Sequence, residues 1–175
     1  MVVNWYDIVW FSQCIPRHSF LVWLLMGEKL KTQDKLKKWE IRSVKNMPIV
    51  CSLCLTEVDS HDHLFFYCPF SSRVWRCVWQ YSDVFQACDS LKDVVQSLLP
   101  ITSKKTSGVI VAKLLFGASV YTILQERNLR LFKKISRPYD KVFDAIFSMV
   151  RLKIMSIKWK NSAQVRIMKD SWKVP

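Results

Sequence analysis

The stretch CSLCLTEVDSHDHLFFYC, residues 51–68, decides how this chain of 175 residues folds. Cys51 and Cys54 form a C-x2-C pair, the spacing at which a tight turn brings two thiolates onto one metal ion. His63 and Cys68 follow and add one imidazole and a third thiolate. Four such groups complete a zinc tetrahedron and leave no position for water. The stretch therefore predicts a structural zinc site rather than a catalytic one.

His61 is the alternative imidazole ligand in this stretch. It lies two residues before His63 and would point to a different side of any helix that carries both. A helix that begins at Asp59 or Ser60 would carry His63 in its first turns, so we favour His63. The other alternative is a metal-free group of reduced side chains. Three cysteines and a histidine within eighteen residues seldom arise by packing alone.

Outward from this stretch, the composition favours helices. Half of the residues are apolar, but the chain has only three glycines and six prolines, too few turn residues for a β-sandwich or barrel. We expect a mainly α fold, in which a small zinc-stabilised helical domain is followed by a basic helical hairpin. The predicted domains are residues 1–99 and 100–175, and the polar run from Thr102 to Gly108 is the best linker.

Capping residues and helical spacing place the individual helices. Pro16 suits the first turn of a helix that Gly27 ends, and Thr32 is the expected N-cap of a short helix ending near Trp39. Further helical patterns cover residues 70–81, 89–99 and 109–134 and begin again at Pro138. The last two should pack as an antiparallel pair. His18 is expected to be a capping or hydrogen-bonded core histidine, and Cys14, Cys77 and Cys88 are expected to be small buried side chains.

The charge is unevenly distributed along the chain. The net charge is +13, and residues 100–175 carry 16 Lys and Arg against 4 Asp and Glu. Such a surface suits a polyanion, so we expect nucleic acid as the partner, RNA more than DNA. Arg127, Arg130 and Lys134 recur at helical spacing and should form one ridge. The predicted phosphate contacts are Arg127, Arg130, Lys133, Lys134, Arg151, Lys153, Lys158 and Lys160.

Three segments carry a family resemblance. The order PRHSFLVWLLMGEKLKTQDKLKKWEI, then CSLC, then DSHDHLFFYCPFSSRVW resembles the zinc-binding domain that follows the reverse transcriptase of plant-type non-LTR (LINE-like) retrotransposons. The resemblance runs from about Trp5 to Trp79, and residues 120–132 are similar to a stretch found downstream in the same elements. The resemblance implies that the zinc ligands are Cys51, Cys54, His63 and Cys68 and that Pro16, His18, Phe20, Trp23, Thr32, Leu36 and Trp39 belong to a hydrophobic scaffold. Glu40 and Leu55 depart from it, at positions where the family commonly has glycine or a similar residue.

The sequence offers no set of catalytic residues. Polymerases and nucleases need several carboxylates that converge on metal ions, whereas Glu126, Asp140, Asp144 and Asp170 have spacings that fit solvated helix faces. The Tyr-x-Asp-Asp signature of a reverse transcriptase, a glycine-rich phosphate loop and a serine elbow are all absent. We therefore expect a non-enzymatic piece that binds nucleic acid while a polymerase does the chemistry.

Two alternatives belong to other classes of function. Phe65, Phe66 and Phe70 are candidates for an exposed patch that would make the chain a protein-interaction scaffold. The chain is otherwise a decayed mobile-element fragment without a selected activity. Neither apolar run is long enough to span a bilayer and no secretory start is visible, so we expect an intracellular location, nucleus or cytoplasm, and no membrane partner.

Overall fold

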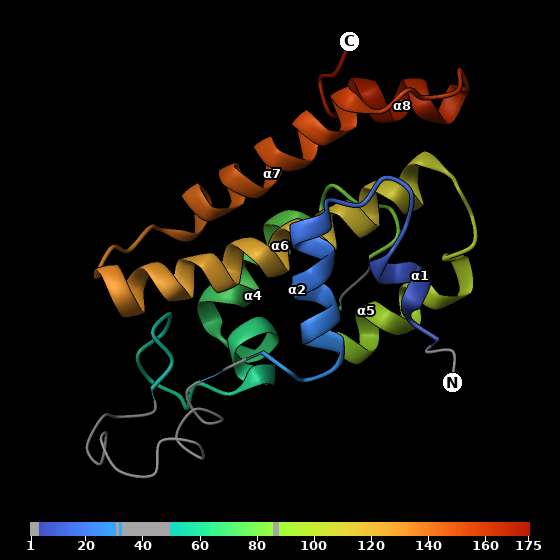
Figure 1. Ribbon diagram of the computed structural model, residues 1–175. Helices are drawn as coiled ribbons and strands as arrows, with labels where there is room; N and C mark the ends of the chain where they lie inside the picture. The colour runs from blue at the N-terminus through green and yellow to red at the C-terminus, as the bar shows by residue number, and fades with distance from the viewer. Residues whose placement is uncertain (1–3, 31, 33–49, 86–87) are drawn as a thin grey trace.

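The computed structural model describes residues 4–30, 32, 50–85 and 88–175 (Figure 1). It is mainly helical, which confirms the predicted fold class. The described residues contain no strand, and Val50 and Val58 form an isolated antiparallel bridge. Of the predicted helix that Thr32 would cap, only Thr32 is described, and it is buried; the remainder to Trp39 lies outside the described residues. The helices are α1 (Tyr6–Val9), α2 (Pro16–Met26), η1 (His63–Tyr67), α4 (Pro69–Trp79), α5 (Leu91–Leu98), η2 (Leu99–Ile101), α6 (Ser107–Asn128), η3 (Leu129–Lys133), α7 (Tyr139–Ser156) and α8 (Ala163–Ser171).

The helix ends follow the local chemistry of the sequence. Pro16 occupies the first turn of α2, and Gly27 follows its last residue, as predicted. Serine or threonine hydroxyls cap α5, α6 and α8 by accepting a hydrogen bond from the backbone N–H three residues on. These caps are Ser90 for α5, Thr106 for α6 and Ser162 for α8.

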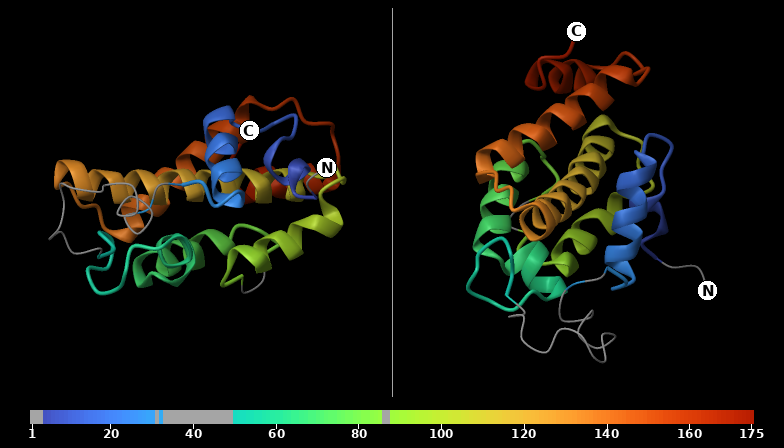
Figure 2. Two further views of the ribbon diagram at one scale, coloured as in Figure 1. Left: turned by 60° about the horizontal axis from the view of Figure 1, so that its bottom comes forward. Right: turned by 60° about the vertical axis from the view of Figure 1, so that its left-hand side comes forward.

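Helix α6 is the centre of the molecule. It lies between α2 and the segment that carries α4 and α5, and α7 runs back along it in the opposite direction (Figures 1 and 2). Residues 111–120 are all buried, so the helix is covered on every side. The predicted antiparallel pair of long helices is therefore α6 and α7, and the buried face of α7 comprises Val142, Ile146, Val150 and Ile154.

Within the described residues, one helical stretch, Ser107–Lys133, is long and apolar enough to cross a membrane by length and composition. However, 78% of its most apolar window is buried inside the structure, as in the core helix of a globular domain. Lys113 interrupts this stretch and is itself buried. Its ammonium donates to the backbone carbonyls of Asp7 at 2.8 Å and Thr102 at 2.9 Å. Burial lowers the pKa of Lys113, and the nearby Asp7 opposes that shift.

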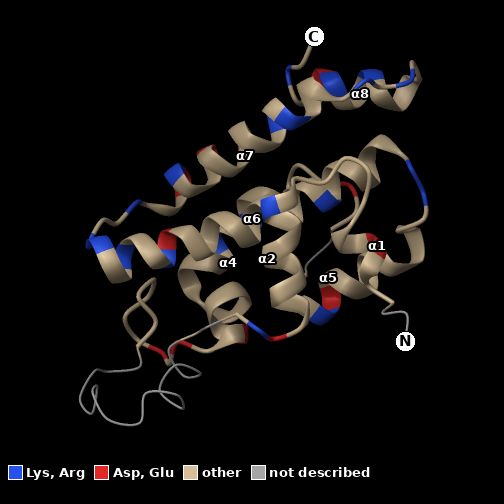
Figure 3. Cartoon of the chain, viewed as in Figure 1, with Lys and Arg blue, Asp and Glu red and all other residues tan. Residues whose placement is uncertain are grey.

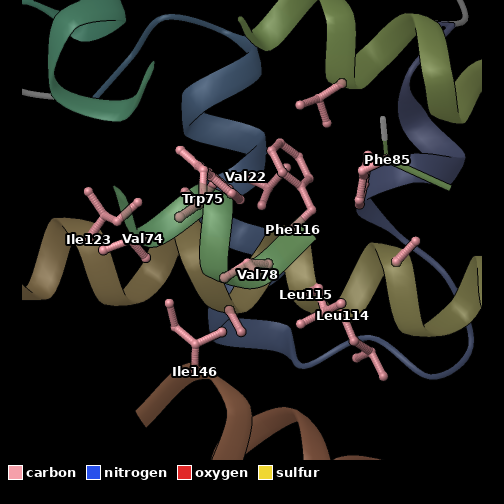
Figure 4. Packing of buried hydrophobic residues seen from close by; sticks show 14 of the residues in the cluster. Val22, Val74, Trp75, Val78, Phe85, Leu114, Leu115, Phe116, Ile123 and Ile146 are labelled. Atoms are coloured by element: carbon pink, nitrogen blue, oxygen red, sulfur yellow. The ribbon is translucent and has the colours of Figure 1, made fainter. Parts of the chain in front are cut away.

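The hydrophobic core is continuous across residue 100. Trp75 of α4 packs against Phe116 of α6 with ring centroids 6.2 Å apart, and Val22 of α2 and Ile146 of α7 belong to the same cluster (Figure 4). The predicted linker at residues 102–108 is thus a connection on the surface of one core, because α6 begins within it and then enters the interior.

Helix α8 has no counterpart among the predicted elements. Its apolar pattern is weak because Met168 is its buried residue, and the anchoring side chains Trp172 and Val174 come after the helix ends. Trp172 stacks on Phe147 of α7 with ring centroids 4.6 Å apart. The helix is therefore held by aromatic contacts that a search for helical periodicity does not detect.

Candidate metal centre

The C-x2-C pair lies in a short turn that its own backbone closes. The N–H of Cys51 donates to the carbonyl of Glu57 at 2.7 Å, and the N–H of Leu55 donates to the carbonyl of Cys51 at 2.8 Å. Leu55 adopts a left-handed conformation with φ 63°, which glycine adopts far more readily. Its side chain is 74% exposed, so it has room in this conformation, but burial of its apolar surface contributes little to stability.

The second half of the site is a helical turn followed by a sharp change of direction. The Ser60 hydroxyl accepts a hydrogen bond from the N–H of His63 at 3.3 Å, which places the histidine in the first turn, as predicted. Cys68 is extended, with φ −65° and ψ 127°, and Pro69 begins α4 directly after it. This reversal returns the Cys68 thiol to the C-x2-C turn.

Four side chains converge in the fold: Cys51, Cys54, His63 and Cys68. Their ligand atoms all lie within 4.8 Å of one another. The Sγ atoms of Cys51 and Cys68 are 3.9 Å apart, and Cys54 Sγ is 3.3 Å from His63 Nε2. In a zinc tetrahedron, neighbouring sulfurs are about 3.8 Å apart and a sulfur and a nitrogen about 3.6 Å apart. The arrangement fits a zinc ion, and all four positions of the tetrahedron would be protein ligands.

The thiols of Cys51 and Cys68 are buried and share a hydrogen bond. The hydrogen bond to Cys68, together with burial, raises the pKa of Cys51, whereas the same hydrogen bond lowers the pKa of Cys68. Thr56 Oγ1 donates to the sulfur of Cys54 at 3.3 Å. Three sulfurs held this close are unfavourable as thiolates unless a positive ion lies among them.

The structure separates the two candidate histidines. His61 is buried, but it is not part of the four-residue cluster. Its ring instead lies edge-on to Phe65, with centroids 5.7 Å apart. The geometry therefore brings His63, and not His61, to the three sulfurs.

One buried ion pair and two hydrogen bonds to backbone carbonyls connect the metal centre to the end of α6 and to η3. Arg127 is only 3% exposed and donates to the carboxylate of Asp59, which is fully buried, at 2.6 Å. Ser52, within the C-x2-C turn, donates to the backbone carbonyl of Arg127 at 3.3 Å. Arg130 donates to the backbone carbonyl of Leu53 at 2.9 Å. The loop that carries two of the four cluster residues is thus bound to the end of the central helix.

Glu126 is fully buried, which corrects the expectation that it lies on a solvated helix face. Its carboxylate accepts hydrogen bonds from Arg130 Nε at 2.8 Å, from Arg137 Nε at 2.7 Å and from the Arg137 N–H at 2.8 Å. Burial alone would raise the pKa of Glu126, but these hydrogen bonds outweigh it and hold the pKa below its ordinary value.

These contacts also correct the predicted ridge of Arg127, Arg130 and Lys134. The Arg127 guanidinium is buried against Asp59, and the Arg130 side chain is 15% exposed and lies over the Phe70 ring at 4.3 Å. An internal ion pair therefore replaces the expected phosphate contact of Arg127, and Arg130 is largely occupied. The i,i+4 spacing of Glu126 and Arg130 is visible in the sequence, but nothing in it points to the pairing of Asp59 with Arg127.

The remaining basic residues lie on the surface of the C-terminal region. Lysine and arginine residues occur at the end of α6 and along α7 and α8 (Figure 3). Arg151 donates to the carbonyl of Lys173 at 2.7 Å, and Lys153 is half-buried. The other predicted contacts, Lys133, Lys134, Lys158 and Lys160, are exposed.

The structure also corrects the predictions for the phenylalanine patch and for His18. The proposed phenylalanine patch does not form, because Phe65 is fully buried, Phe66 is 5% exposed and Phe70 packs against the core. His18 is a core histidine whose two ring nitrogens have no hydrogen-bond partner within the described part of the chain, and its ring lies 4.6 Å from that of Tyr121.

Asp140 and Asp144 lie on exposed positions of α7, and Lys141 pairs with Asp144 at 3.3 Å, which is the intrahelical charge pair that the spacing indicates. Among the other cysteines, Cys88 is buried and Cys14 and Cys77 are half-buried.

Comparison with known families agrees with this geometry. Residues 1–75 match the family described as zinc-binding in reverse transcriptase. Searches of curated proteins and of solved structures returned no match. The family resemblance predicted from the sequence is confirmed for these residues, and so is zinc as the cofactor, since the family description and the cluster of three cysteines and one histidine agree.

Proposed function

We propose that this chain, whose first 75 residues match a zinc-binding domain of reverse transcriptase, is a non-catalytic module that binds nucleic acid through its basic C-terminal region. In this proposal the zinc ion is structural, and its ligands are Cys51, Cys54, His63 and Cys68. The bound polymer is RNA or an RNA/DNA template inside the cell, and the partner protein is the polymerase domain of a reverse transcriptase.

The observation that carries the proposal is the separation of the basic residues into two groups. Arg127, Arg130 and Arg137 are engaged by buried or largely buried carboxylates and carbonyls, so they maintain the fold. Lys133, Lys134, Lys158 and Lys160 are exposed instead. These lysines make no ion pair with the described residues, and lysines of this kind in a region with a large positive excess are suited to phosphate binding.

The buried arginines support the proposal indirectly. They connect the loop of residues 51–58 and the adjoining Asp59, here called the zinc loop, to α6 and η3. The metal centre therefore holds the end of α6 in place. The exposed lysines 133 and 134 lie directly after this connection. Zinc would then position the basic surface without touching the nucleic acid.

The test is binding of single-stranded RNA by the full chain at about 50 and 200 mM salt, since phosphate contacts release counterions. We expect at least a tenfold loss of affinity at the higher concentration, a conservative estimate for several phosphate contacts. Charge reversal at Lys133, Lys134, Lys158 and Lys160 should abolish binding. The matched control reverses four exposed basic residues outside this region, Lys29, Arg73, Arg76 and Lys92, and should keep most of the affinity.

Three outcomes would overturn the proposal. One is an affinity that changes less than about threefold between the two salt concentrations, because phosphate contacts cannot behave so. Another is equal loss of binding in the control and in the C-terminal reversal, which would indicate non-specific attraction. The third is no binding by the zinc-loaded chain at all.

A further inference from the structure

The turn that follows α6 presents an exposed aromatic ring beside two lysines. Phe132 is 71% exposed, the highest value among the large aromatic side chains in the described part of the chain. Lys133 and Lys134 follow it and are exposed, and Ile135 is 51% exposed. Because the core gains nothing from this ring, its position is not explained by folding.

The backbone of this turn is held at both ends. Glu126 accepts hydrogen bonds from Arg130 before the turn and from Arg137 after it, and Arg130 also donates to the carbonyl of Arg137 at 2.8 Å. Lys134 adopts a left-handed conformation, with φ 55° and ψ 26°, which non-glycine residues rarely adopt. A binding surface fixed in this way loses little conformational entropy when a ligand binds.

We propose that Phe132 is a stacking platform for a base of single-stranded nucleic acid, with Lys133 and Lys134 at the flanking phosphates. This inference rests on the proposed function. It adds that the nucleic acid is single-stranded and that Phe132 is the residue that distinguishes a single strand from a duplex. An aromatic ring can stack on a base only where the face of the base is free, and the faces are hidden in a duplex. Lysines beside the ring disfavour a protein partner, because lysine is depleted from protein interfaces.

Two other exposed aromatic residues, Tyr6 and Phe20, lack this combination. Tyr6 is 56% exposed, but Asp7 follows it and would repel phosphate. Phe20 is 50% exposed, but its ring stacks on Trp23 with centroids 5.9 Å apart, so the ring is already partly occupied. Phe132 thus combines a free ring with neighbouring positive charge.

The experiment compares the affinity of the full, zinc-loaded chain for two labelled probes. One is an oligouridine of about 12 nucleotides, within the usual range of site sizes, and the other is an RNA duplex of the same length. Phe132→Ala should weaken binding of the single strand about tenfold and that of the duplex less than about twofold. Phe132→Trp should retain the affinity for the single strand. Tyr6→Ala is the matched control and should change neither affinity.

The outcomes distinguish this inference from the proposed function. If Phe132→Ala leaves the single-strand affinity unchanged, or weakens both probes equally, stacking is overturned, even if reversal of Lys133 and Lys134 still weakens both. If the wild-type chain binds neither probe, the proposed function fails and the inference fails with it. Selective loss for the single strand, with one zinc per chain in every variant, supports stacking.

Discussion

At the scale of single residues, Cys51 gives the most direct test of the metal centre. Its thiol is fully buried and lies 3.9 Å from that of Cys68. Cys51→Ser should lose the bound zinc and a large part of the stability, because structural zinc in small zinc peptides contributes on the order of 10 kcal/mol of apparent binding free energy. Metal analysis by mass spectrometry and a thermal melt measure the two effects.

Cys77→Ser is the matched control for this substitution. Cys77 is half-buried in α4 and lies outside the four-residue cluster, so its replacement should leave one zinc per chain. A Cys51→Ser chain that melts at the wild-type temperature and still retains one equivalent of zinc would show that Cys51 is not a ligand.

His18 makes the stability depend on pH through a different mechanism. Burial, assisted by the positive charge of Arg17, lowers the pKa of His18 from 6.5 to about 4. The unfolded chain therefore binds a proton below about pH 6.5 that the folded chain does not accept until about pH 4. Stability is fully present above pH 6.5 and is lost as the pH falls between these values, by about 3 kcal/mol in total.

The measurement is the free energy of unfolding of wild type and His18→Phe by denaturant titration between pH 7 and pH 4. Zinc release in acid affects both chains, so the difference between them isolates His18. We expect the wild type to lose stability relative to the variant as the pH falls, whatever their difference at pH 7. Parallel pH dependence in the two chains would contradict a buried neutral histidine.

The four-residue cluster was predictable and the buried pair of Asp59 and Arg127 was not, for one physical reason. A C-x2-C turn and a histidine in the next helical turn are fixed by local spacing, which the sequence displays directly. Asp59 and Arg127 are 68 residues apart, and their pairing depends on how α6 packs against the metal centre. A local sequence pattern predicts that a basic residue near a helix end is exposed to solvent. It therefore predicts a surface position for Arg127, which the structure shows to be buried.

At the scale of structural elements, the pair of Asp59 and Arg127 connects the zinc loop to α6. Both side chains are almost fully buried, and their atoms are 2.6 Å apart. Asp59→Ala would leave a guanidinium buried without this carboxylate, which should lower the free energy of unfolding by about 3 kcal/mol. Denaturant titration measures the change.

The control for this prediction is Asp62→Ala. Asp62 belongs to the same segment, but its side chain is 73% exposed, so its removal should change the stability by less than about 0.5 kcal/mol. Equal effects of the two substitutions would mean that Asp59 acts only through the net charge of the segment and not through its buried partner.

Among the elements, the long helices follow from local sequence patterns, and α8 does not. The buried face of α7 repeats at spacings of four residues, and the mostly apolar run of α6 from Val109 to Leu124 is too long for a strand. Helix α8 is held by Trp172, which stacks on Phe147 after the helix has ended. A contact made from outside a helix leaves no periodic signal within it.

At the scale of the whole molecule, the metal centre and the basic helices share one hydrophobic core. The core cluster includes Cys51 and Cys68 of the metal centre, Phe116 of α6 and Ile146 of α7. The change in charge near residue 100 suggests two regions, but charge describes the surface and carries no information about how the interior is divided. For this reason the sequence indicated the separation of charge correctly and did not indicate the continuity of the core.

This continuity predicts that zinc removal loosens helices far from the metal. Without the ion, three close sulfurs repel or take up protons, the loop of residues 51–58 separates, and Arg127 and Arg130 lose partners at Asp59 and Leu53. We expect a zinc-selective chelator to reduce amide hydrogen-exchange protection in α6 and α7 as well as in the loop. A calcium-selective chelator at the same concentration is the control and should have no effect. If protection falls only within residues 50–68, the metal centre is an independent unit and the buried ion pairs do not couple it to the basic helices.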